Sequence, residues 1–140
     1  MKIEYFLKKD GFLDKCALDG GVYVVDLLKE ESEEVIHLYV GEAGCIVKRC
    51  GKHLMEFSEK PEYFGIKKDH IDDDSLILRF SVKESLNDKD GRYNEEYKKN
   101  ELNTIEELKP LTQNEKNDHM RPIEKKIARV EKAMKEKGFI

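Results

Sequence analysis

The chain has 140 residues, of which 40% are charged and 39% are hydrophobic, and its formal net charge is −4 with the histidines neutral. This length is enough for one compact domain with a modest core. No apolar run is long enough for a signal peptide or a membrane span, so we expect a cytoplasmic protein with no membrane partner. The net charge argues mildly against nucleic acid as a partner, because phosphate binding favours a basic surface.

Basic and acidic residues occupy different parts of the chain. Basic side chains gather at Lys48, Arg49, Lys52 and His53, whereas acidic ones are concentrated at residues 30–34. A local basic surface on an acidic protein is therefore compatible with this sequence.

The three cysteines, Cys16, Cys45 and Cys50, form no CxxC pair. This pattern predicts neither a disulfide framework nor a tetrahedral zinc site, and we interpret the cysteines as reduced, partly buried thiols. A metal cluster of Cys45, Cys50 and His53 is the weaker alternative.

Apolar patterning predicts three strands. Residues 1–20 mix apolar and polar side chains, and turns are predicted at Asp10-Gly11 and Asp19-Gly20-Gly21. Residues 22–27 and 35–40 are rich in β-branched and aromatic side chains, and the acidic connection at 29–34 is short enough for an antiparallel hairpin. Residues 75–81 have the same character and predict the third strand.

Each of the first two strands carries a tyrosine. Strict alternation places Tyr23 on the same face as Val25, and Tyr39 on the same face as Val35 and His37. Tyrosines in strands usually serve packing, so these positions alone do not indicate a functional site.

Helical periodicity predicts three helices, at about residues 45–57, 93–108 and 122–137. Pro110 ends the second helix and Pro122 opens the third. We therefore expect an α+β fold, a small three-stranded antiparallel sheet flanked by helices, within a single domain of residues 1–140.

The last helix has apolar residues at coiled-coil-like spacing, at Ile123, Ile127, Val130 and Met134. Only about two heptads are present, which favours packing onto the helix's own domain over a dimer seam. The chain is accordingly expected to be a monomer or a weak homodimer through this C-terminal helix.

Glu101 is a carboxylate within the apolar stripe of the second helix, together with Tyr97, Ile105 and Leu108. A buried carboxylate is costly unless it is paired, hydrogen-bonded or bound to a metal. Glu101 is therefore either a functional group or one half of a structural ion pair.

Arg49 and His53 lie four residues apart, on one flank of the first predicted helix. Arginine offers a planar fork to phosphate oxygens, and histidine can transfer a proton near neutral pH. The alternative is a solvated helix edge without a functional role.

Taken in order, several of these residues resemble a known motif. Gly21-Val22-Tyr23 and Tyr39-Val40-Gly41 resemble the two sequences that name the GIY-YIG nucleases. The spacing to Arg49 and His53 also matches that family, as does Glu101 with Ile105 four residues later and Pro110 nine residues later. The resemblance covers a GIY-YIG-like core at about residues 20–114, followed by the helix at about 122–137. Gln113 departs from it, since the family often has Asn there.

The resemblance implies a metal-dependent endonuclease that hydrolyses phosphodiester bonds in DNA. One Mg²⁺ or Mn²⁺ ion per chain would be held by Glu101, and Arg49 would neutralise charge on the phosphate. Tyr23 would orient or deprotonate the attacking water, with Tyr39 and His53 as helpers. The residues expected to contact the substrate are Gly41, Lys48, Lys52 and Gln113.

Two other functions remain open at this point. The chain could be a non-catalytic nucleic-acid-binding module that retains the fold, as its acidic balance and Gln113 suggest. It could also be a structural or protein-interaction domain whose motif is accidental. The loops at residues 59–74 and 85–92 are where we expect DNA specificity to arise, and the acidic loop is expected to point away from the substrate.

Overall fold

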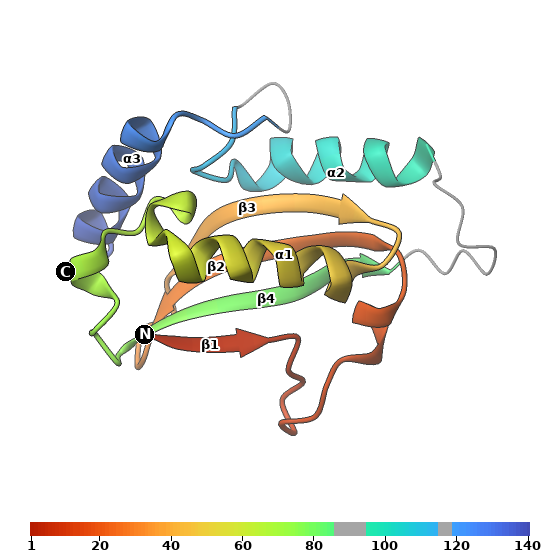
Figure 1. Cartoon of the computed structure of the whole chain (residues 1–140), viewed down its shortest axis with the longest axis horizontal. Coiled ribbons are helices and arrows are strands. Elements are labelled where there is room, and N and C mark those ends of the chain that lie inside the picture. Colours follow the sequence, from red (N-terminus) through yellow and green to blue (C-terminus); the bar gives the residue numbers. More distant parts are fainter. Residues whose placement is uncertain (86–94, 115–118) are drawn as a thin grey trace.

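The computed structural model describes residues 1–85, 95–114 and 119–140 and has an α+β fold (Figure 1). Its strands and helices are, in chain order, β1 (Lys2–Tyr5), β2 (Gly21–Lys29), β3 (Val35–Ala43), α1 (Ile46–Glu59), β4 (Leu76–Ser85), α2 (Glu95–Leu108) and α3 (Ile123–Glu136). Short 3₁₀ helices are η1 (Lys15–Leu18), η2 (Pro61–Phe64) and η3 (Lys68–His70). The three predicted helices and the three predicted strands are all confirmed. Most of the 85–92 loop lies outside the described residues.

The prediction of a three-stranded antiparallel sheet was wrong, because the sheet has four strands and is mixed. Its order is β1-β4-β2-β3, with β2 antiparallel to both neighbours and β1 parallel to β4. The added strand has only four residues, and charged Lys2 and Glu4 interrupt its apolar pattern. It pairs with a strand more than 70 residues away, as in Ile3 with Leu78, and no local pattern reveals such a partner.

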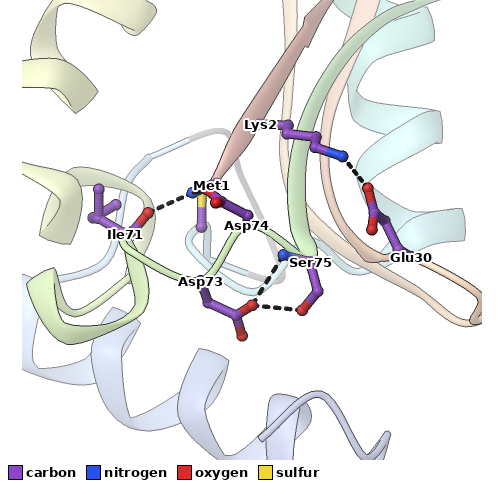
Figure 2. Close-up of polar contacts among 7 residues, drawn as sticks. All are labelled: Met1, Lys2, Glu30, Ile71, Asp73, Asp74 and Ser75. Carbon is purple, nitrogen blue, oxygen red and sulfur yellow. Dashed lines mark hydrogen bonds and ion pairs between the residues drawn. The ribbon is translucent and has the colours of Figure 1, made fainter.

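Polar contacts fix the N-terminal end of β1, as Figure 2 shows. The terminal amino group of Met1 donates to the carbonyl of Ile71, and the Lys2 ammonium pairs with the Glu30 carboxylate. Glu30 belongs to the acidic loop between β2 and β3. This loop lies at the far end of the hairpin from the pairing of Tyr23 with Gly41, and its orientation relative to a substrate stays a prediction.

A β-bulge in β3 overturns the predicted alternation of that strand. Val25 pairs with Tyr39, but the next residue, Asp26, pairs with His37, so Leu38 is the extra residue. Tyr39 and Leu38 therefore belong to the same core cluster, while His37 turns to the opposite face and pairs with Asp26 at 2.8 Å. A two-residue repeat cannot indicate such an insertion, so the predicted grouping of Tyr39 with Val35 and His37 was wrong.

Helices cover the sheet unequally. In Figure 1, α1 crosses in front of the sheet and α2 runs along its β3 edge. The main core lies on the α1 side and includes Tyr23, Phe64 and Val130, whereas a smaller cluster on the other face joins Val40 to Ile105 of α2. The edge strand β3 therefore lies between two helices.

The C-terminal helix α3 packs onto its own domain. Val130 and Met134 are buried in the main core, while Ile123 and Ile127 at the start of the stripe are only partly buried. Among the residues described, no helix is long and apolar enough to cross a membrane.

The segment after α2 closes the outer edge of β3. Leu111 and Thr112 donate backbone N–H groups to the carbonyls of His37 and Leu38. The buried Gln113 continues this contact with its side chain, which accepts from the Val40 N–H at 2.9 Å and donates to the Val40 carbonyl at 2.7 Å. Its amide thus takes the place of a neighbouring strand at Val40, beside Tyr39.

Replacing Gln113 with alanine should lower the free energy of unfolding by about 2–4 kcal/mol, because both backbone groups of Val40 would lose a buried partner. Urea denaturation monitored by circular dichroism measures the change. Asn103→Ala, which removes an exposed amide on α2, is the control and should change stability by no more than about 0.5 kcal/mol. A Gln113→Ala protein as stable as the control would show that Gln113 does not hold this edge.

Candidate active site

The site begins with the close crossing of Tyr23 over Gly41. These two residues are directly paired in the β2–β3 ladder. A Cβ atom added to Gly41 would lie only 2.3 Å from the Tyr23 hydroxyl oxygen, so only glycine leaves room for the ring to cross the neighbouring strand. The structure therefore gives Gly41 a role in placing Tyr23, and its expected contact with substrate stays a prediction.

His53 lies between two tyrosine hydroxyls. Its Nε2 atom is 2.7 Å from the hydroxyl of Tyr23, and its Nδ1 atom is 2.8 Å from the hydroxyl of Tyr63. Tyr23 and His53 are only 1% and 3% exposed, whereas Tyr63 is partly open to solvent. Burial lowers the pKa of His53 to about 4, and the nearby charge of Arg49 acts in the same direction. The imidazole is therefore neutral at physiological pH.

Tyr63 was not predicted to belong to the site. It lies in the 3₁₀ helix η2, which directly follows α1 and reverses the chain so that the tyrosine returns to the helix. The available sequence signals were Pro61 before it and Gly65 after it, which mark a tight turn but not its direction.

Arg49 faces the tyrosine cluster from α1. Burial on its own would lower the pKa of the guanidinium, but the neighbouring phenols, chiefly Tyr23, raise the pKa by more. Burial, together with the nearby Tyr63 and Glu101, raises the pKa of Tyr39 to about 12. Burial also raises the pKa of Tyr23, well beyond that of a free phenol. Tyr23 is thus protonated at neutral pH and needs a partner to act as a base.

Glu101 is buried on α2, as its position in the apolar stripe predicted. It is 4% exposed, and the Lys98 ammonium lies 2.9 Å from its Oε1 atom. Its charge is close enough to Tyr39 to affect the pKa of that phenol. The carboxylate on α2 and the cluster on α1 therefore meet at the β3 edge.

The donor atoms near Glu101 are compatible with only one kind of metal site. Within residues 1–85, 95–114 and 119–140, no group of three or more His, Cys, Asp and Glu side chains is placed to hold a metal ion. A single carboxylate nevertheless suits Mg²⁺, which keeps several waters and commonly binds one or two carboxylates together with phosphate oxygens. Lys98 would have to yield part of its contact with the carboxylate to such an ion.

The cysteines contribute no such site. Cys16, Cys45 and Cys50 are free thiols, exposed, partly buried and fully buried respectively. Burial raises the pKa of Cys50, which keeps its thiol protonated.

A basic cleft adjoins the cluster. A cavity of about 420 Å³ is lined by the end of β3, including Glu42, by the turn that follows and by Lys48, Arg49 and Lys52 of α1. A second cavity of about 310 Å³ is lined by Arg49, Lys52, His53, Glu56 and Tyr63. Arg49 and Lys52 border both, so cations line the surface beside His53 and Tyr63.

The structure brings most of the predicted site residues together. Tyr23, Tyr39, Arg49 and His53 form one cluster, and Lys48 and Lys52 line the cleft beside it. Gln113 instead contacts the backbone of β3, as described above. Comparisons with protein-family models, with curated proteins and with solved structures found no match.

The depressed pKa of His53 makes the stability of the protein depend on pH. The unfolded state takes up a proton near pH 6.5 and the folded state only near pH 4, so stability present above pH 6.5 is lost as the pH falls through this window. The contribution is on the order of 3 kcal/mol. Urea denaturation between pH 7.5 and 4 measures it as the difference between the wild type and His53→Gln. Parallel pH curves for the two proteins would contradict a buried neutral imidazole.

Proposed function

We propose that this protein is an endonuclease of the GIY-YIG type, which hydrolyses phosphodiester bonds in DNA. The observation that supports this most is the convergence of Arg49, Tyr23 and His53 beside a basic cleft. Tyr23 comes from β2 and the other two residues from α1. The Tyr23 hydroxyl lies 2.7 Å from His53 Nε2, and Arg49 is close enough to Tyr23 to affect the pKa of both groups, whereas a solvated helix edge would leave Arg49 and His53 apart from the strands.

In this proposal the cleft receives the scissile phosphate. Lys48 and Lys52 hold the backbone of the nucleic acid, and Arg49 presents its guanidinium to the phosphate as negative charge develops on it. The local cluster of cations explains how a chain with net charge −4 can bind a polyanion. The acidic loop is kept at the opposite end of the β2–β3 hairpin.

Tyr23 acts on the attacking water, with His53 as its proton acceptor. The phenol cannot ionise by itself near neutral pH, because burial raises its pKa. His53 is neutral there and offers a bare ring nitrogen at hydrogen-bond distance. Glu101 would hold one divalent ion, Mg²⁺ or Mn²⁺, which when bound would polarise the phosphate and stabilise the leaving oxyanion.

One observation favours the alternative of a non-catalytic nucleic-acid-binding module. The Lys98 ammonium lies 2.9 Å from Glu101, where it compensates the buried carboxylate without any metal. A protein of this kind would bind DNA through Lys48 and Lys52 but would not cut it. Cleavage of DNA that depends on the Glu101 carboxylate would distinguish the endonuclease from the binding module.

The wild type should nick supercoiled circular DNA or cut branched DNA when Mg²⁺ or Mn²⁺ is added, and Glu101→Gln should abolish this cleavage. The amide keeps the shape of the side chain but loses the charge that holds the cation. Gel assays of cleavage, with DNA binding measured by fluorescence anisotropy, provide both readouts. Glu106→Gln, an exposed carboxylate on the same helix, is the matched control and should cut at the wild-type rate.

Binding should remain within a few-fold of wild type in Glu101→Gln. Full cleavage by this variant would remove Glu101 from the mechanism. A wild type that binds DNA but does not cut it with either metal would instead support the non-catalytic module.

Replacing Arg49 with alanine should reduce the single-turnover cleavage rate by about 10²–10³-fold, because it removes charge stabilisation from the transition state. Lys60→Ala, an exposed cation just beyond α1, is the control for a simple loss of positive charge. An unchanged single-turnover rate for Arg49→Ala would assign the residue to binding or folding and not to the chemical step.

A further inference from the structure

Both ring nitrogens of His53 are engaged by phenols, and this limits the way in which the proton can be arranged. A neutral imidazole has one N–H donor and one bare acceptor nitrogen. Since Tyr23 lies 2.7 Å from Nε2 and Tyr63 lies 2.8 Å from Nδ1, one of these tyrosines donates to the ring and the other accepts from it. The two tautomers of His53 therefore assign opposite roles to the two tyrosines.

The surroundings of the Tyr23 and Tyr63 hydroxyls indicate which of the two His53 tautomers is present. Tyr23 is only 1% exposed and its hydroxyl lies at hydrogen-bond distance from Nε2 of His53, so its proton has this nitrogen within reach and no route to solvent. Tyr63 lines the 310 Å³ cavity together with Arg49, Lys52 and Glu56, so its hydroxyl can donate to solvent. An N–H donor at Nδ1 satisfies Tyr63 and leaves Nε2 bare for the proton of Tyr23.

Helix α3 fixes Tyr63 in this position. The buried Lys126 donates its ammonium to the carbonyl of Tyr63 at 2.9 Å, and the same ammonium lies 5.0 Å from the centre of the tyrosine ring. Gly65 lies two residues after Tyr63 and has a φ of 76°. It packs so closely on α3 that an added Cβ would lie 2.8 Å from the Lys126 carbonyl. Helix α3 thus holds both Tyr63 and the end of the turn that carries it.

We propose that Tyr63 is a positioning residue that sets the tautomer of His53 and connects it to solvent. The inference rests on the proposed nuclease function and adds to it the route by which the proton leaves. Tyr63 accepts the Nδ1–H of His53, and this makes Nε2 the acceptor for Tyr23.

The transfer can be written as a balanced sequence of proton movements. As the water oxygen bonds to phosphorus, its proton passes to the Tyr23 oxygen and the proton of Tyr23 passes to Nε2 of His53. In the same movement the Nδ1 proton passes to the Tyr63 oxygen, and the original proton of Tyr63 goes to water in the cavity. Both phenols and the imidazole end neutral, and His53 has changed tautomer.

The leaving oxygen takes its proton from a second water in the cleft, which becomes hydroxide. The starting tautomer is restored when the same proton movements occur in reverse and deliver one proton from solvent to that hydroxide. A neutral ring throughout agrees with the burial of His53, whose pKa of about 4 disfavours an imidazolium.

Tyr63→Phe tests the inference, because it removes only the hydroxyl and retains the ring that packs on Phe64 and Lys126. Two-bond ¹H–¹⁵N spectra of His53 identify the protonated nitrogen without any need for activity. We expect the wild type to carry its proton on Nδ1, and Tyr63→Phe to lose this preference. Its single-turnover cleavage rate should fall by about tenfold or more.

Tyr5→Phe is the matched control, because Tyr5 also donates its hydroxyl to α1, at the carbonyl of Val47, but does not contact His53. This variant should retain the wild-type tautomer and rate. A wild-type proton on Nε2, or an unchanged tautomer and rate in Tyr63→Phe, would overturn the inference. An inactive wild type would refute the nuclease proposal alone, since the spectra still decide which tautomer Tyr63 sets.

Discussion

The arrangement of the site depends on one close approach, that of the Tyr23 ring over Gly41. Paired strands place opposite residues about 5 Å apart, and a side chain on Gly41 would occupy the space that the phenol needs. Because the ring can cross β3, its hydroxyl reaches His53 on α1 and is not confined to the centre of the sheet. The edge of β3 thereby becomes the place where α1 and α2 can both contribute polar groups.

The polarity of this region follows from how deeply the phenols are buried. Tyr23 and Tyr39 lie in a largely apolar core, which raises the pKa of both hydroxyls, while the charge of Arg49 opposes that effect. The same burial keeps His53 neutral. The result is a set of weak acids and one weak base that exchange hydrogen bonds without carrying charge, beside a rim of exposed cations. Such an arrangement suits proton transfer to a ligand that binds at the rim.

Sequence periodicity was sufficient for the parts of the fold that follow local rules. It located α1, α2, α3 and the strands β2, β3 and β4, and it identified Glu101 as a buried carboxylate. It missed β1, whose partner is remote, and it misjudged the face of Tyr39, because the extra residue Leu38 leaves no mark on the pattern. Tyr63 was not predicted for a related reason. Its contact with His53 depends on the direction of a turn, which Pro61 and Gly65 do not specify.

The C-terminal helix illustrates how far a segment outside the motif can affect the site. Its apolar spacing resembles a coiled-coil seam but is short enough to favour packing onto its own domain, and Val130 and Met134 are indeed buried in the core of this chain. Lys126 lies within the apolar side of the helix, and burial lowers its pKa, so its ammonium is stable there only because the Tyr63 carbonyl and ring compensate it. That compensation works in both directions, since the lysine that requires Tyr63 also holds it against His53. Helix α3 is therefore part of the wall of the site, although it lies beyond the residues that carry the motif.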